Sequence, residues 1–185
     1  MQKIPTIFQR ESRWVVDRPR NGCEWVFEGY GKPTFKWDGT SVLLDDDLAM
    51  WKRRDVKPGQ GEPVGFLISE EDSNTGRRFG WVPSSESNPS DKWHFEGLRN
   101  LDLRLPGTYE LVGPKVQGNP HQMEEHRLIP HGQAYLFDVP TEFEALWRWL
   151  WSEDRQTGFE GVVWHHGDGR MAKIKRRDFL PIEVQ

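Results

Sequence analysis

The stretch EGVVWHHGDGRMAKIK, residues 160–175, predicts a β-hairpin. Two runs that carry β-branched or aromatic residues flank residues 167–169, a Gly-Asp-Gly triplet of the kind that favours tight turns. Because side chains alternate between the two faces of a strand, Lys173 and Lys175 share one face of the second strand. Two lysines on one face are unusual in a core, so we expect that face to meet solvent or an anion.

Short runs of the same character recur along the chain between Gly, Pro and Asp residues. They are TFKWDGTSVLL (34–44), RRFGWVP (77–83), GTYELVG (107–113) and QAYLFDV (133–139). The stretches 57–76 and 83–91 are rich in Pro, Gly, Ser and acidic residues, and are expected to be surface loops. The sequence therefore predicts a protein that is mostly sheet.

One helix is predicted directly after Pro140. Thr141 and Glu144 have the spacing of a capping box, which marks the beginning of a helix. The apolar residues that share one helical face are Phe143, Leu146, Trp147, Leu150 and Trp151. We expect this helix to pack across a sheet and to carry no chemistry.

The composition fits a folded domain. Of the 185 residues, 35% are hydrophobic and 29% are charged, and we expect one domain over residues 1–185, with residues 1–35 of uncertain role. The formal net charge of -4 argues against a coat that binds nucleic acid by charge alone. Cys23 is the only cysteine, so no disulfide forms within one chain, and no apolar run reaches membrane-spanning length. A cytoplasmic protein is expected, with no membrane association.

The tetrapeptide KWDG, residues 36–39, gains meaning from three motifs later in the chain. By itself it predicts a strand that runs into a turn. The later motifs are, in order, ELVG (110–113), EGVV (160–163) and KIK (173–175). A lysine, two strand-borne glutamates and a late pair of lysines resemble the motif series of the covalent nucleotidyltransferases. That superfamily comprises ATP- and NAD-dependent polynucleotide ligases and GTP-dependent RNA capping enzymes.

The resemblance is closer to one branch of this superfamily. GWVP (80–83), ELVGPKVQGNP (110–120), LIPHG (128–132) and EGVVWHHGDG (160–169) resemble the ATP-dependent 5′-phosphate/3′-hydroxyl RNA ligase family that includes the human RNA ligase 1. The resemblance implies an α+β fold, a nucleotidyltransferase (ATP-grasp-like) domain. In it, two antiparallel sheets form a cleft flanked by helices, and no C-terminal OB domain follows.

The resemblance also implies a role for each motif residue. Lys36 would be the nucleophile that forms a covalent lysyl-AMP, and Lys173 and Lys175 would be catalytic cations. Glu160 would contact the metal. The residues implied in nucleotide binding are Asp38, Gly39, Arg53, Glu110, Phe137 and Val163, of which Glu110 would hydrogen-bond the ribose, Arg53 would contact the sugar, and Phe137 and Val163 would hold adenine. Arg54 is the alternative to Arg53.

Physical chemistry asks for the same residue types. A lysine that attacks a phosphate must be neutral, whereas the ordinary pKa of a lysine is about 10.4. Burial, neighbouring cations such as Lys173, Lys175 and Arg53, and a metal ion all lower such a pKa. Phosphoryl-type transfer gains mainly from alignment and charge stabilisation, and magnesium prefers oxygen ligands such as a carboxylate and water. ATP and Mg²⁺, with Mn²⁺ as an alternative, are the expected cofactors.

The resemblance therefore predicts an RNA ligase that adenylylates itself, transfers AMP to an RNA 5′-phosphate and seals it to a 3′-hydroxyl. RNA with these ends is the expected partner, and no protein partner is evident. Phe35 stands where RNA ligases of this group often have an acidic residue, which weakens the choice of ATP over another nucleotide. A DNA ligase or a GTP-dependent capping-type enzyme stays open, because the same four motifs would serve either. A third alternative is an inactive nucleotide- or RNA-binding module. His131, in the LIPHG string, has no assigned role.

Overall fold

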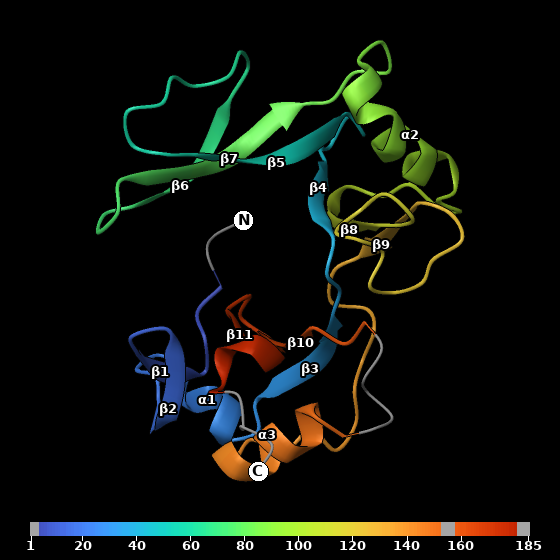
Figure 1. The fold of residues 1–185 in the computed structure, drawn as a ribbon. Helices are drawn as coiled ribbons and strands as arrows, with labels where there is room; N and C mark the ends of the chain where they lie inside the picture. The colour runs from blue at the N-terminus through green and yellow to red at the C-terminus, as the bar shows by residue number, and fades with distance from the viewer. Residues whose placement is uncertain (1–3, 153–157, 181–185) are drawn as a thin grey trace. The chain divides into compact units, whose positions relative to one another are not determined.

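The computed structural model describes residues 4–152 and 158–180. The described chain is α+β, as predicted, with antiparallel sheets and a few short helices (Figure 1). It divides into two compact units, which are described separately. The described residues of the first unit are 38–131, and those of the second are 4–37, 132–152 and 158–180. The single domain, the cleft and the absence of an OB domain stay predictions.

The second unit is built on a three-stranded sheet. Its order is β11 (Met171–Lys175), β10 (Gly161–His166), β3 (Gly31–Lys36), and both pairings are antiparallel. The hairpin predicted from residues 160–175 is confirmed as β10 and β11. One face of this sheet carries Phe35, Val162 and Ile174, which pack into the hydrophobic core of the unit. The lysines of β11 lie on the opposite face, because Ala172 and Ile174 point into the core.

Several short elements complete the core of the second unit. They are the hairpin of β1 (Phe8–Glu11) and β2 (Trp14–Pro19), the helix α1 (Glu24–Phe27) and the helix α3 (Phe143–Leu150). Leu146 and Leu150 of α3 are fully buried, so this helix packs as predicted. Its N-cap is Glu142, whose carboxylate accepts a hydrogen bond from the Ala145 N–H. The capping box predicted at Thr141 was therefore wrong by one residue.

Both edges of the three-stranded sheet are covered by irregular chain. Backbone hydrogen bonds join Pro5 and Ile7 to Lys173 on the β11 edge. On the β3 edge, the segment 134–136 bonds to the backbone of residues 33 and 35. The prediction of a strand over 133–139 was wrong, because Asp138 adopts the left-handed φ of 53°, which ends extended backbone.

The first unit is built on a six-stranded antiparallel sheet. Its order is β6 (Leu67–Asp72), β7 (Arg77–Pro83), β5 (Met50–Val56), β4 (Thr40–Leu44), β8 (Gly107–Val112), β9 (Arg127–Pro130). The run TFKWDGTSVLL is thus two strands, since β3 ends at Lys36 and β4 begins at Thr40 in a different sheet. The expected loop over residues 57–76 contains β6, so that expectation was wrong in part.

One face of the six-stranded sheet is covered by a helix. The helix α2 (Lys92–Arg99) follows a short 3-10 turn, η1 (Pro89–Asp91), and contacts β8 and β9. Val42, Leu44, Tyr109 and Leu111 form the buried core on this face. The opposite face therefore carries the alternate residues, among them Ser41 and Glu110. Within residues 4–152 and 158–180, no helix is long and apolar enough to cross a membrane.

Candidate functional site

The strand register of the second unit brings two of the predicted catalytic lysines into one row. Gly161 of β10 lies opposite Lys36 of β3 on one side and opposite Lys175 of β11 on the other. Residues in one row share a face of the sheet, so both lysine side chains extend from the same face, on either side of a residue without a side chain.

Gly161 is required by close packing of the backbone. A Cβ at this position would lie 2.1 Å from the carbonyl oxygen of Ile174 and 2.8 Å from the Cα of Lys175. Backbone atoms give way less readily than the end of a side chain, so a larger residue would force the two strands apart. The glycine of the EGVV motif thus maintains the pairing that aligns Lys36 with Lys175.

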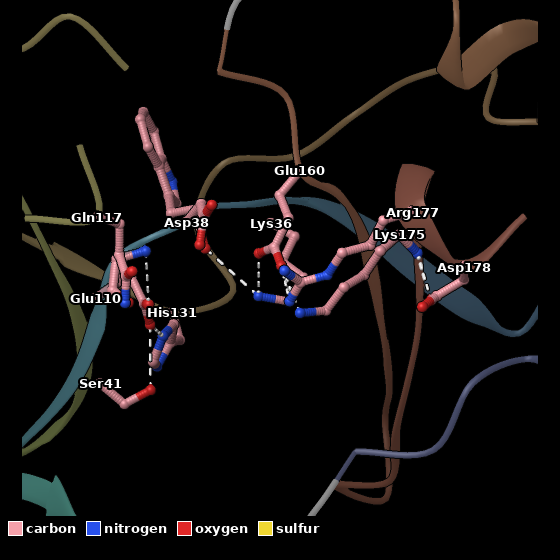
Figure 2. Close-up of polar contacts among 12 residues, drawn as sticks. Lys36, Asp38, Ser41, Glu110, Gln117, His131, Glu160, Lys175, Arg177 and Asp178 are labelled. Atoms are coloured by element: carbon pink, nitrogen blue, oxygen red, sulfur yellow. Dashed lines mark hydrogen bonds and ion pairs between the residues drawn. The ribbon is translucent and has the colours of Figure 1, made fainter. Parts of the chain in front are cut away.

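Glu160 is the acceptor on which the positive charges converge. Figure 2 shows Lys36, Lys175 and Arg177 directed toward its carboxylate. Lys36 Nζ lies 2.5 Å from Oε2, Lys175 Nζ forms an ion pair with Oε1, and an Arg177 guanidinium nitrogen lies 3.4 Å from Oε1. Lys36 Nζ also donates to the Trp37 carbonyl at 3.4 Å. The Glu160 side chain is only 7% exposed, whereas that of Arg177 is 71% exposed.

The charges in this lysine cluster (Lys36, Glu160, Lys173 and Lys175) shift one another's pKa values. Burial by itself raises the pKa of Glu160, but the charge of Lys36 and the hydrogen bonds from both lysines hold that pKa below its ordinary value. Burial and the charge of Lys36 lower the pKa of Lys175, against the opposing effect of Glu160. For Lys173, burial followed by the charges of Lys175 and Lys36 lowers the pKa to about 8.

Lys173 lies in the next row of the same sheet face. Val163 of β10 separates it from Thr34 of β3. Val163 is buried, and the Thr34 hydroxyl donates to its carbonyl oxygen at 3.1 Å. Phe137, the predicted partner of Val163 around adenine, lies in an irregular segment and is 82% exposed. Tyr135 forms an isolated backbone bridge with Thr34, so the chain segment of Phe137 passes beside this row.

The chain that follows β11 fixes the backbone of Glu160 and of Lys175. The Arg176 N–H donates to the Glu160 carbonyl at 3.0 Å, and the Lys175 N–H donates to the Asp178 carboxylate at 2.9 Å. Asp178 is buried in the 3-10 turn η3 (Arg176–Asp178) and forms an ion pair with Arg10 of β1. Sequence reasoning missed Arg10 and Asp178, because only the fold brings residue 10 close to residue 178.

A second polar cluster, which we call the Glu110 cluster, lies in the first unit. It consists of Glu110 and the three groups that donate to its carboxylate (Figure 2). The Gly39 N–H donates to Oε1 at 3.0 Å, the Ser41 hydroxyl donates to Oε2 at 3.2 Å, and His131 Nε2 lies 2.9 Å from Oε2. Ser41 lies directly opposite Glu110 in the pairing of β4 with β8. Two motif residues from the prediction, Gly39 and Glu110, are therefore in contact.

Gly39 meets a steric requirement similar to that of Gly161. A Cβ on Gly39 would lie 2.1 Å from the Leu111 carbonyl oxygen and 2.9 Å from Glu110 Cγ. Only glycine lets the chain approach β8 closely enough to donate its N–H to Glu110. Neighbouring Asp38 is held by its own N–H, which donates to His121 Nε2 at 2.9 Å. The structure thus gives the KWDG turn a physical reason that the sequence alone does not provide.

Arg53 lies on the face of the six-stranded sheet that carries Glu110. β4 and β5 pair with Val42 opposite Lys52, and continuing that register places Arg53 opposite Ser41. Its guanidinium lies over the rings of Phe79 and Trp81, at 5.3 and 5.7 Å from their centroids. Arg54 points to the opposite face and is exposed. Of the two arginines considered from sequence, Arg53 is the one on the face of the Glu110 cluster.

The predicted site residues are thus divided between the two units. Six belong to the second unit: Lys36, Phe137, Glu160, Val163, Lys173 and Lys175. Four belong to the first unit: Asp38, Gly39, Arg53 and Glu110. His131 is the contact that sequence reasoning left without a role; its LIPHG string was noticed, but its partner depends on the register of β8 and β9.

The described residues fit a divalent cation that is coordinated jointly by the protein and by a bound nucleotide. Among residues 4–152 and 158–180, no group of three or more His, Cys, Asp or Glu side chains is arranged to hold a metal ion. Glu160 offers one buried carboxylate, and magnesium commonly takes one or two carboxylates together with water and substrate phosphates. The residues present fit a cation that is held mainly by a bound nucleotide.

Comparison with known proteins gives a family match over the second half of the chain. Residues 98–182 match the family model of RNA ligase 1. RNA ligase 1 of Danio rerio is 30% identical over 127 residues, which are 52% of this chain and 39% of that protein. RNA ligase 1 of Mus musculus is 29% identical over 153 residues, 66% of this chain and 44% of that protein. The chain thus spans less than half the length of these curated relatives.

Among solved structures, a mutant RNA ligase of Naegleria gruberi with AMP and Mn aligns with 93% of this chain and 57% of its own, at 18% identity and a TM-score of 0.41. The family model and the curated relatives all carry the description RNA ligase 1. They confirm the resemblance stated from the motifs: the chain is similar to RNA ligase 1 over the matched residues.

Proposed function

We propose that this chain is the adenylyltransferase domain of an ATP-dependent RNA ligase and that Lys36 is its nucleophile. The observation that carries the proposal is the convergence of Lys36, Lys175 and Arg177 on the buried carboxylate of Glu160. Three cations around one carboxylate provide a dense positive charge for a polyphosphate. The family resemblance supplies the choice of RNA.

The first step is self-adenylylation. The Lys36 nitrogen, after losing a proton to water, attacks the α-phosphorus of ATP; the bond from that phosphorus to the bridging oxygen breaks, and pyrophosphate leaves. Lys173 and Lys175 stabilise the charge that develops on the phosphates. Burial leaves both ammonium groups poorly solvated, which lowers the pKa of each lysine. Such groups gain by binding an anion.

The second and third steps join RNA ends. An oxygen of the RNA 5′-phosphate attacks the phosphorus of lysyl-AMP, the phosphorus–nitrogen bond breaks, and Lys36 regains a proton. The RNA 3′-hydroxyl then attacks the 5′-phosphate phosphorus, loses its proton, and releases AMP. The chain's own residues bind and align the reactants in these steps, and such alignment contributes most of the rate in phosphoryl transfer.

The Glu110 cluster has a separate part in this proposal. Glu110 holds the ribose of the nucleotide, and Arg53 contacts the same sugar from the neighbouring strand. A bound magnesium or manganese ion, held by Glu160 and the phosphates, would neutralise charge on the nucleotide. Val163, with an aromatic side chain from the segment of Phe137, provides the apolar surface for adenine.

The proposal is tested by supplying α-labelled ATP or GTP, and then nicked RNA or nicked DNA. The proposal expects label on the protein with ATP and sealing of RNA. Labelling by GTP would favour the capping-type alternative, and sealing of DNA the DNA ligase alternative. Absence of any label would favour the inactive binding module. Lys36→Ala should take up no label from ATP. Lys32→Ala, at an exposed position on the same strand, is its matched control and should be labelled like the wild type.

A further inference from the structure

His131 lies where the pairing of β8 with β9 comes to an end. Tyr109 pairs with Pro130, and the His131 N–H then donates to the Thr108 carbonyl at 3.1 Å, one residue beyond that pair. Its ring is held at both nitrogens: Nδ1 lies 3.0 Å from the Thr108 hydroxyl, and Nε2 lies 2.9 Å from Glu110 Oε2. Main chain and side chain thus fix the imidazole against β8.

The chemistry of the partners determines the direction of these bonds. A carboxylate can only accept, so the hydrogen of the contact with Glu110 resides on His131 Nε2. The Thr108 hydroxyl can donate or accept, so it pairs with Nδ1 whichever form the ring takes. Thr108 therefore holds the ring in the orientation that directs its Nε2–H at Glu110, as an outer partner orients a ligating histidine.

The donors around Glu110 leave room for a ligand. A carboxylate has about four acceptor positions. In the described part of the chain, Gly39, Ser41 and His131 donate to three of them. Two of these bonds are on Oε2 and one is on Oε1, so the remaining acceptor position is on Oε1. The Glu110 side chain is 10% exposed and that of His131 is 26% exposed, so the cluster is accessible from solvent.

We infer that His131 is a positioning residue that, together with Thr108, fixes the Glu110 carboxylate so that Oε1 accepts a hydrogen bond from a ribose hydroxyl of the nucleotide. The inference rests on the proposed function, which gives Glu110 its ribose. It adds the residue that makes this carboxylate selective for a ribonucleotide. Without the bond from His131, Oε2 keeps only the weaker hydrogen bond from the Ser41 hydroxyl at 3.2 Å, and the carboxylate is held less firmly.

The test compares ATP with 2′-deoxy-ATP and 3′-deoxy-ATP as substrates for self-adenylylation, in the wild type and in His131→Ala, His131→Gln and Thr108→Val. The wild type should have a lower KM for ATP than for the analogue that lacks the hydroxyl bound by Glu110. His131→Ala should raise the KM for ATP roughly tenfold, toward that of this analogue, because an aligned bond to a charged group is lost. The KM of the analogue itself should not change.

Two further variants separate positioning from simple structural damage. His131→Gln, which retains an N–H donor, should keep part of the preference for ATP, and Thr108→Val should lose a smaller part than His131→Ala. His166→Ala, in the hairpin of the other unit, serves as the matched control. An equal rise in KM for ATP and both analogues, or no discrimination by the wild type, would overturn the inference while leaving self-adenylylation intact. A wild type that forms no adduct would instead refute the proposed function, and the inference with it.

Discussion

Lys173→Met replaces a largely buried ammonium group, beside two other lysines, with an apolar side chain of similar length. The backbone bonds of residue 173 to Pro5 and Ile7 do not involve its side chain, so the substitution retains them. Burial, and then the charges of Lys175 and Lys36, lower the pKa of Lys173 from 10.5 to about 8. Since one pKa unit corresponds to about 1.4 kcal/mol, holding this charge in the folded protein costs roughly 3 kcal/mol near neutral pH.

The dependence on pH follows from the protons bound by each state. Below about pH 8 both states carry the Lys173 proton, and the folded state bears the whole cost. Between there and the ordinary lysine pKa of about 10.4, the unfolded chain holds a proton that the folded chain has lost, so wild-type stability rises with pH. Above that range the cost is gone. Methionine does not titrate, so we expect Lys173→Met to stabilise the protein by about 1–3 kcal/mol near neutral pH and progressively less toward about pH 10.

Urea unfolding of both proteins across this pH range measures the difference. Lys32→Met, at an exposed position on β3, is the matched control and should change stability by less than about 0.5 kcal/mol. The same Lys173→Met protein should form much less lysyl-AMP, because the substitution that raises stability also removes a positive charge proposed to stabilise the phosphates during the reaction. A variant that is less stable than the wild type near neutral pH, or a gain that does not shrink as pH rises, would refute the reasoning.

Three more predictions concern the two glycines and the shared carboxylate. Gly39→Ala should destabilise the first unit by about 1–3 kcal/mol, because its Cβ would meet a backbone oxygen; Gly61→Ala, in open space, is the control in the same unfolding assay. Gly161→Ala should cost a similar amount in the second unit, with Gly167→Ala as its control, and equal stability within either pair would contradict the steric account. The Glu160 pKa lies below its ordinary value because the charge of Lys36 and the lysine hydrogen bonds outweigh burial. The ion pairs of Glu160 therefore stabilise the fold above about pH 4.3, and they stabilise it less as pH falls below that value. Glu160→Gln should therefore flatten the loss of stability in acid, and an unchanged acid limb would count against this ion-pair network.

Local patterns predicted the parts of the fold in which neighbouring residues suffice. The Gly-Asp-Gly turn and the alternation of residues 171–175 specified the hairpin and the shared face of Lys173 and Lys175. The run at 133–139 has the same apolar character, yet its strand is interrupted by a left-handed residue, Asp138. β5, with the sequence MWKRRDV, and β6, with LISEED, carry too many charged residues for their pattern to be recognised as sheet.

The candidate site was predictable in its residues and not in its contacts. The motif order pointed to Lys36, Glu110 and Glu160. The bonds that Glu110 receives depend on the register of β4, β8 and β9, which the sequence does not state. The hydrogen bond that the Lys175 N–H donates to Asp178 is local, but the ion pair of Asp178 with Arg10 joins two segments of the second unit that are far apart in the sequence. These contacts depend on strand register and on pairing between distant segments, which the motifs do not specify.

The central claim, that Lys36 is the nucleophile, is tested most directly by locating the adduct. The protein is incubated with ATP and magnesium, the reaction is quenched without acid because a phosphorus–nitrogen bond is acid-labile, and the peptides are sequenced by mass spectrometry. The account predicts one AMP per chain, attached to Lys36, and none in Lys36→Arg. AMP attached to Lys173 or Lys175, or an adduct that persists in Lys36→Arg, would contradict it.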